Sequence, residues 1–294
     1  MKPKQILSVF FIVGLVACSK VVEYELPYDG DKIVLNCILW ANEPISVSVT
    51  KSAPPTGTIS NDLALNDATV DFFENGNYLE TFKLNPNGFY ESITGFMPVE
   101  GQEYYLVVSS TNFETVRSLP VKIPSKPNVV LNEVTKNPYH ENTAGLQAKI
   151  VIKDPENETN FYQLSSYGSL NNNKEWLQTQ YYLLGVSYDA PPPCYNFSYL
   201  GELYSDYCEN GNDINFILNI QNEFYPPGIP SINFDKILIP VANISSDYYN
   251  YLLEYNRVTG IELVFFNPEM LPTNVEGGYG IVGSGNREIL KIIL

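Results

Sequence analysis

Apolar and polar residues alternate with a period of two along much of the chain. Residues 45–50 read Ile-Ser-Val-Ser-Val-Thr, and residues 67–73 follow a similar alternation. The Glu-Asn-Gly-Asn run at 74–77 is a hairpin signal between that stretch and residues 78–84. Because a period of two places alternate side chains on opposite faces of an extended chain, these stretches predict half-buried β-strands.

About seven such strands are expected in the roughly 100 residues before Pro124, including residues 104–109 and 115–123. Short strands at this spacing predict an immunoglobulin-like β-sandwich over residues 28–125. The Pro-Ser-Lys-Pro sequence at 124–127 then predicts a stiff, extended joint, because the two prolines restrict the backbone around them.

Strand patterns resume after this joint, so a larger β-rich domain is expected over residues 126–294. The expected strands lie at residues 129–134, 146–152, 161–167, 214–220, 234–241, 262–266 and 280–294.

One short helix is expected after the Ser-Ser-Asp sequence at 245–247, whose side chains can cap free backbone N–H groups. The Tyr-rich run that follows places Tyr248, Tyr251, Leu252 and Tyr255 on one helical face. The predicted fold class is therefore all-β, with an N-terminal immunoglobulin-like sandwich and a larger β-rich domain that carries this helix.

The first eighteen residues have a different pattern. Two lysines precede an apolar run over residues 6–17, which is too short to span a bilayer and is typical of a signal peptide. The Leu-Val-Ala-Cys sequence that ends at Cys18 resembles a bacterial lipobox. We therefore expect residues 1–17 to be cleaved as a lipoprotein signal peptide, Cys18 to carry lipid, and residues 18–27 to form a tether.

The composition is that of a folded, acidic protein. Hydrophobic residues make up 44% of the 294 residues and charged residues 17%, a balance typical of globular domains. The formal net charge is −16, and removal of the two signal-peptide lysines takes the side-chain charge to −18. Such a surface repels nucleic acid, so no nucleic-acid partner is expected.

Three cysteines remain besides Cys18. Cys194 and Cys208 bracket one irregular segment, and they are candidates for a disulfide in an oxidising compartment. Cys37 lies within an apolar run and is expected to be a buried small hydrophobe. Because His140 is the single histidine and no Cys-x-x-Cys motif occurs, no metal site and no cofactor are expected.

No catalytic motif is present in the sequence. A Ser-His-Asp arrangement would need His140, which lies in a polar stretch with no nucleophile motif nearby. A glycosidase-like carboxylate pair stays open, because acidic residues are abundant and the sequence does not give their separation. The oxygen-rich run at 154–158 lacks EF-hand spacing and is interpreted as a charged turn. We expect a non-enzymatic protein, with a hydrolase as the residual alternative.

An aromatic segment from about residue 189 to residue 212 is the sharpest local hypothesis. An irregular loop of this length is either functional or disordered, and its aromatic content argues against disorder. Two interpretations stay open, namely rings that contact a ligand or partner and rings that fold back as a satellite core. The residues concerned are Tyr195, Phe197, Tyr199, Tyr204 and Tyr207.

Residues 278–283 read Gly-Tyr-Gly-Ile-Val-Gly and match the Gly-x-Gly-x-x-Gly pattern of dinucleotide-binding folds. That fingerprint needs a helix directly after the glycines, whereas strand patterning follows here. The glycines are therefore interpreted either as a strand start where backbone passes close to backbone or as a glycine bulge.

The stretch that contains these glycines, Pro272–Gly283, resembles the C-terminal signature of the Bacteroidetes lipoprotein family known as domain of unknown function 4249. Tyr279 and Val282 stand where Leu and Phe are commoner in that family, which changes packing more than role. A Tyr-rich helix before the glycines also fits. Further matching segments are the Leu-Pro segment at 25–27, Asn-Glu-Pro at 42–44, the Thr-x-Ser-x-Pro-like stretch at 50–54 and Asp-Ala-x-Val at 67–70.

The resemblance implies an outer-membrane lipoprotein, often encoded near TonB-dependent receptors and without assigned catalytic residues. The expected function is therefore an accessory to a TonB-dependent transporter, acting by ligand capture or receptor docking, with lipid on Cys18 as its membrane contact. The alternative is an adhesion or envelope-structural lipoprotein in which the sandwich is a spacer. The face of the outer membrane that it occupies stays open.

Overall fold

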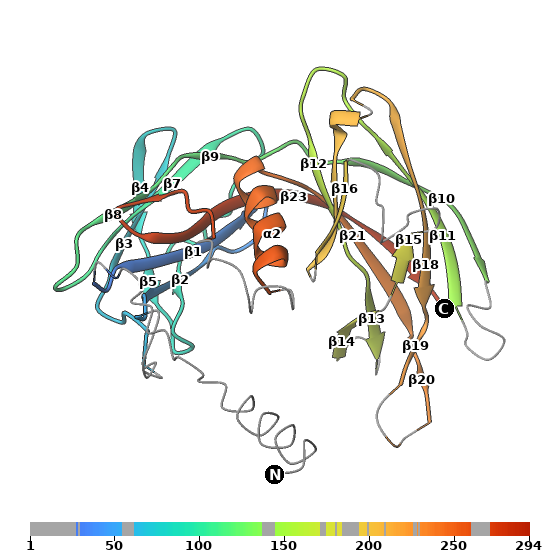
Figure 1. The fold of residues 1–294 in the computed structure, drawn as a ribbon, viewed down its shortest axis with the longest axis horizontal. Helices are drawn as coiled ribbons and strands as arrows, with labels where there is room; N and C mark the ends of the chain where they lie inside the picture. The colour runs from blue at the N-terminus through green and yellow to red at the C-terminus, as the bar shows by residue number, and fades with distance from the viewer. Residues whose placement is uncertain are drawn as a thin grey trace, which may run out of the picture.

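Two β-sandwiches share one long strand in the computed structural model of the chain (Figure 1). The structure describes residues 28, 30–54, 62–136, 145–170, 175–179, 181–183, 194–198, 200–208, 210–225, 228, 230–259 and 271–294. No helix in these ranges is long and apolar enough to cross a membrane. The all-β prediction with one short helix is confirmed.

The first sandwich packs two sheets around one apolar core. One sheet contains β1 (Ile33–Trp40), β2 (Ser46–Lys51), β6 (Tyr90–Glu91) and β5 (Lys83–Leu84). The facing sheet contains β22 (Val275–Glu276), β8 (Val116–Ser118), β7 (Glu103–Ser109), β3 (Thr69–Glu74) and β4 (Asn77–Thr81), with β9 (Val121–Lys122) also paired to β7.

Burial along β1 alternates with a period of two, as expected for a strand with one face in this core. Ile33, Leu35, Cys37 and Leu39 are all buried and point between the sheets. The alternate residues are only half-buried and belong to the other face of the strand.

The second sandwich is built in the same manner from the middle and end of the chain. Its first sheet contains β16 (Tyr195–Ser198), β17 (Gly201–Ser205), β12 (Phe161–Leu164), β21 (Lys236–Ile244) and β23 (Tyr279–Ile293), with β13 (Tyr167–Leu170) and β14 (Glu175–Gln178) alongside. The facing sheet contains β10 (Asn128–Lys136), β11 (Gly145–Lys153), β18 (Asp213–Gln221) and β15 (Tyr181–Leu183). The second sandwich also contains a two-stranded ribbon and a 3-10 turn. These are β19 (Glu223–Phe224) with β20 (Ile232–Asn233), and η1 (Asp206–Cys208).

Strand β23 joins the two sandwiches into one eleven-stranded sheet. Its first half pairs in parallel with β1 from Tyr279 to Gly285, and its second half pairs antiparallel with β21 from Gly285 to Ile293. Figure 1 shows this red strand running across the whole molecule. Residues 275–285 thus hydrogen-bond within the first sandwich, although the boundary expected at residue 126 places them in the second domain. That boundary stays a prediction.

The predicted helix is present as α2 (Ser246–Thr259), between the two sandwiches (Figure 1). Tyr248, Tyr249 and Leu252 are buried in a third apolar cluster with Leu203 and Ile244. Ile38 and Trp40 from the outer face of β1 also pack on this cluster, so β1 is covered on both faces. Parallel pairing is typical of strands covered on both faces, which fits the β1–β23 pairing.

The C-terminal glycines allow β23 to lie close to its neighbours. A Cβ atom at Gly278 would stand 2.5 Å from the carbonyl oxygen of Ile33, and one at Gly283 would stand 2.7 Å from Tyr248 Cβ. Gly280 has a φ of +105°, and a side chain there would meet the backbone of Leu35. The prediction of close backbone approach is confirmed, because side chains of any size would push β23 off β1 and α2.

Candidate functional site at the sandwich junction

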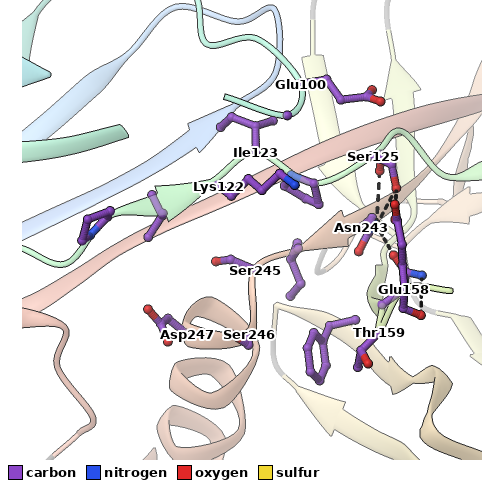
Figure 2. Close-up of a pocket in the computed structure, with 17 residues that line it drawn as sticks. Glu100, Lys122, Ile123, Ser125, Glu158, Thr159, Asn243, Ser245, Ser246 and Asp247 are labelled. Carbon is purple, nitrogen blue, oxygen red and sulfur yellow. Dashed lines mark hydrogen bonds between the residues drawn. The ribbon is translucent and has the colours of Figure 1, made fainter. Parts of the chain in front are cut away.

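A cleft of about 520 Å³ lies where the two sandwiches meet. Its walls come from four segments, namely Glu100–Gly101, the joint at 120–125, residues 158–161 at the start of β12, and residues 243–247 where β21 leads into α2. Figure 2 shows Lys122 and Ile123 on one side of the first turn of α2, with Ser125, Asn243 and Glu158 close together at one end.

One end of the cleft is held by Asn243. Its Nδ2 atom donates to the Ser125 carbonyl oxygen at 3.2 Å and to Asn160 Oδ1 at 2.6 Å. Ser125 Oγ donates in turn to Glu158 Oε2 at 3.1 Å. These dashed contacts in Figure 2 bind the joint between the sandwiches to β12 and β21.

The shared strand β23 holds the joint from beneath. Asn286 Nδ2 donates to Glu100 Oε2 at 2.9 Å and to the Pro124 carbonyl oxygen at 3.2 Å. Ser284 Oγ donates to the Lys122 carbonyl oxygen at 2.7 Å. With its backbone bonded at several points, the joint does not act as a hinge, and the cleft is pre-formed.

The cleft is rich in hydrogen-bond acceptors. Three carboxylates line it, from Glu100, Glu158 and Asp247, against the single ammonium group of Lys122. Hydroxyl oxygens of Thr159 and Ser246 also line the cleft. Hydroxyl and carboxylate oxygens can accept hydrogen bonds from donor groups on a ligand. A hydroxyl-rich or cationic ligand suits such walls, and an anion does not. Among the described residues no group of His, Cys, Asp or Glu side chains is arranged to hold a metal ion.

Two buried carboxylates support the cleft floor. Asp154 accepts hydrogen bonds from Tyr162 Oη at 2.6 Å and from the Gly211 N–H at 2.9 Å. Asp206 accepts the Asn160 N–H at 2.6 Å, while its Oδ1 atom has no partner in the described structure. Burial raises the pKa of Asp206, and the hydrogen bond from Asn160 offsets only part of that effect. This network positions Asn160, which itself lines the cleft.

The cleft was not predicted from the sequence. Of the residues that hold it, Asn243 stands near the end of the apolar strand β21, and Asn286 stands in the polar middle of β23. A buried Asn inside a strand is the signal that could have drawn attention to them, since buried amides require partners.

The aromatic segment folds differently from the expected loop. Residues 195–198 and 201–205 form the hairpin β16–β17, and η1 follows, so the expectation of one long irregular loop is wrong for these residues. Tyr195 and Tyr204 are buried in the second core, which is the alternative that the sequence left open. Tyr207 is 87% exposed. Of Phe197 only the backbone is described, and Tyr199 lies outside the described residues.

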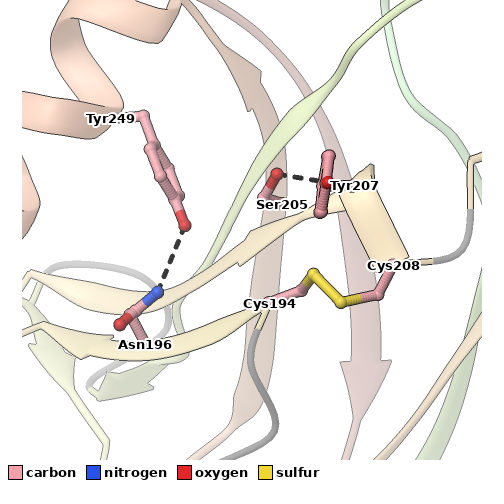
Figure 3. The surroundings of a disulfide bond; sticks show 6 residues. All are labelled: Cys194, Asn196, Ser205, Tyr207, Cys208 and Tyr249. Atoms are coloured by element: carbon pink, nitrogen blue, oxygen red, sulfur yellow. Dashed lines mark hydrogen bonds between the residues drawn. A yellow bond between two sulfur atoms is a disulfide. The ribbon is translucent and has the colours of Figure 1, made fainter.

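Cys194 and Cys208 form a disulfide in the structure, with their Cα atoms 6.0 Å apart (Figure 3). The bond ties the residue before β16 to η1. Nearby, Asn196 Nδ2 donates to Tyr249 Oη at 3.3 Å, which links the hairpin to α2. The segment is therefore bonded to both the second core and the junction helix.

Burial also affects Glu202 on β17. Its side chain is 2% exposed, and burial raises its pKa to about 7, partly offset by the Tyr195 hydroxyl, which donates to it. Burial raises the pKa of the Cys37 thiol to about 12, so this cysteine stays protonated and unreactive at neutral pH. Cys18, the tether at 18–27 and His140 lie outside the described residues.

The fold and the junction define an all-β protein of two sandwiches with a pre-formed polar cleft between them. The sequence pattern of the family described as Domain of unknown function (DUF4249) matches residues 19–289, and the chain belongs to that family.

Other comparisons give little more. No curated protein sequence matches the chain. A solved structure titled "Biofilm associated protein - BSP domain" is similar at 7% identity and a TM-score of 0.20, with 95% of this chain covered. The chain spans 62% of the length of that structure. Similarity at this level establishes neither a shared fold nor a shared function.

Proposed function

We propose that this protein is a non-enzymatic, lipid-anchored outer-membrane protein that assists a TonB-dependent transporter, with the junction cleft as its ligand-capture site. The observation that carries the proposal is the pre-formed cleft between two sandwiches that share β23. A cleft with fixed walls binds with a smaller ordering cost, because the conformational entropy of its walls is already lost in folding.

The chemistry of the walls supports binding rather than transformation. Glu100 and Asp247 each accept hydrogen bonds from neighbouring residues of the chain, which holds them in place as recognition groups. The ligand that fits is polar, uncharged or cationic, with several donors. Polar groups of this kind, few in number and fixed in direction, give small-molecule sites their specificity.

The anchoring part of the proposal rests on the sequence. The lipobox-like residues that end at Cys18 supply the membrane contact, and the family resemblance supplies the transporter. The Cys194–Cys208 disulfide supports an oxidising location, since such bonds persist mainly outside the cytoplasm.

Co-purification from detergent-solubilised outer membrane tests this proposal. An affinity-tagged full-length chain should recover a TonB-dependent receptor, and Cys18→Ala should move the protein to the soluble fraction. Recovery of no receptor, together with binding to other cells or to a surface matrix, would favour the adhesion alternative. Retention of Cys18→Ala in the membrane would refute the anchor.

A further inference from the structure

The segment between β6 and β7 exposes apolar side chains from a well-ordered loop. Ile93 is 67% exposed, Met97 is 45% exposed and Val99 is 47% exposed. We call residues 92–99 the apolar loop. One member of it, Phe96, turns inward and packs edge-on against Phe72 and against Tyr104 in the first core. The loop therefore has an anchored side and a solvent side.

A buried carboxylate shapes the first half of the apolar loop. Glu80 is 8% exposed and its Oε2 atom accepts the N–H groups of Ile93 at 2.9 Å and Thr94 at 3.1 Å. Its Oε1 atom accepts the hydroxyls of Ser92 at 2.5 Å and Thr94 at 2.9 Å. Four donors on three successive residues leave Ile93 at the tip of a rigid turn.

The second half is fixed as firmly. The Asn42 N–H donates to the Pro98 carbonyl oxygen at 2.8 Å, and the Val99 N–H donates to Tyr104 Oη at 3.0 Å. The Phe96 N–H donates to Ser92 Oγ at 2.8 Å. Exposure of the apolar side chains is thus a property of the ordered loop. Rigid apolar groups held in solvent are typical of binding surfaces, because they dock with little loss of entropy.

The negative charge at the two ends of the apolar loop indicates the charge of the surface that it would bind. Glu91 and Glu100 flank the apolar loop directly in the sequence, and residues 92–99 contain no Lys or Arg. Glu91 and Glu100, at the two ends of the loop, form no ion pair in the described structure. A second copy of this chain, of formal charge −16, and an anionic lipid surface would both be repelled. A basic surface is attracted.

The apolar loop is also continuous with the cleft. Val99 is followed by Glu100 and Gly101, which form part of the cleft wall, and Figure 2 labels Glu100 there. A protein bound on the loop would stand beside the opening of the cleft.

We propose that the apolar loop docks into an apolar socket, bordered by Lys or Arg side chains, on a protein partner, with Ile93 and Met97 as the inserted groups. The inference rests on the proposed function for the partner's identity, the co-purified receptor. Docking there places the receptor at the cleft, where a captured ligand is handed over.

The test compares two variants of the full-length chain in the outer-membrane co-purification. Ile93→Asp combined with Met97→Asp should reduce the recovered receptor about tenfold or more, as expected for anchor residues. The matched control is Ile293→Asp, because Ile293 is also 67% exposed but lies at the end of β23 in the other sandwich. The control should recover the receptor as the unchanged chain does. Both proteins should melt within about 2 °C of the unchanged chain, since the altered side chains are exposed.

Equal recovery by the double variant and the unchanged chain overturns the inference and leaves the proposed function standing. If the unchanged chain recovers no receptor, a photo-crosslinking residue at position 93, compared with one at position 293 in intact cells, decides the matter. The inference requires a protein adduct at 93 alone, lost when Met97→Asp is added and weakened at high salt. No adduct, adducts at both positions, or an adduct with a second copy of the chain overturns it.

Discussion

Each sandwich buries a glutamate, and the two side chains have opposite pKa shifts. In the first sandwich, burial alone would raise the pKa of Glu80, but hydrogen bonds from Ser92, Thr94 and Ile93 outweigh it and hold the pKa below its usual value. In the second sandwich, burial dominates and raises the pKa of Glu202 to about 7, although Tyr195 donates to it. The balance between burial and the hydrogen bonds donated to each carboxylate decides the sign.

The difference separates two ways of ordering a segment. Glu80 keeps its charge and uses it to shape a loop that has no disulfide and no regular pairing. Glu202 lies in a hairpin that is already ordered by β-pairing, by the Cys194–Cys208 bond and by the contact of Asn196 with α2. The loop in the first sandwich therefore depends on a charge, and the hairpin in the second depends on β-pairing, a covalent bond and its contact with α2.

The largest expected loss of stability comes from displacing β23, the strand that both sandwiches share. Gly280→Val should destabilise the protein by about 4 kcal/mol or more, because a side chain there meets the Leu35 backbone at a φ of +105°. Urea unfolding should show loss of both sandwiches together. Gly76→Ala is the control, with positive φ but open space, and should cost about 1 kcal/mol. Similar losses for the two variants would contradict the account of β23.

Loss of the disulfide should distinguish the two sandwiches. Replacing Cys194 and Cys208 by Ser should lower the free energy of unfolding by about 3 kcal/mol, through the entropy of the opened loop in the unfolded chain. Hydrogen exchange should accelerate in β16 and β17 and remain unchanged in β3 and β7. Equal acceleration in both sandwiches would show that the bond stabilises the molecule as a whole.

Removing the charge of Glu80 should destabilise the apolar loop of the first sandwich and leave the hairpin of the second unchanged. Glu80→Gln should cost about 2 kcal/mol, because one acceptor oxygen becomes a donor that faces hydroxyl or backbone donors. Exchange at Ile93 and Thr94 should accelerate, while β17 stays protected. Glu103→Gln is the control, an exposed glutamate on β7 whose replacement should leave stability unchanged. An intact loop in Glu80→Gln would show that packing of Phe96 alone orders it.

The pH dependence of stability should have opposite signs at the two glutamates. The raised pKa of Glu202 means that the folded chain holds its proton more tightly, so its contribution is complete below pH 4.5 and is lost as the pH rises toward 7. The slope should approach about 1 kcal/mol per pH unit and flatten in Glu202→Gln. The lowered pKa of Glu80 means that its contribution is lost only as the pH falls below about 4.5, its ordinary value. Urea unfolding of the unchanged and variant chains from about pH 3 to pH 8 measures both slopes, with the Glu80 slope at the acidic end and the Glu202 slope between pH 4.5 and 7.

The pattern of neighbouring residues was enough to predict individual strands and the helix, but it did not predict how the strands pair. Alternation in β2, the Tyr-rich face of α2 and the close approach at Gly280 were all predicted from nearby residues. The parallel pairing of Val34 with Tyr279 was not predicted, because the two residues are 245 positions apart and neither stretch contains a signal for the strand it pairs with. Composition could not decide between contact and core for Tyr195 and Tyr204, since the number of aromatic rings does not show which face of a hairpin they occupy.

The same limit applies to the cleft. Its walls come from four separate segments, and Asn243 or Asn286 acquires a role only when those segments are brought together. The part of Glu80 in ordering the apolar loop was similarly hidden, because a single glutamate in a strand reads as a solvent-facing residue until its burial is known.

The position of β23 in the chain also sets an order of events during folding. The first sandwich receives its parallel strand from residues 279–285, so β1 lacks that neighbour until those residues have been synthesised. Contacts of such sequence separation form slowly, because a long loop must close first. For a chain that is exported as proposed, this delay is useful: a polypeptide must stay unfolded to pass through a narrow translocation channel, and here a strand made much later than β1 completes the first sandwich.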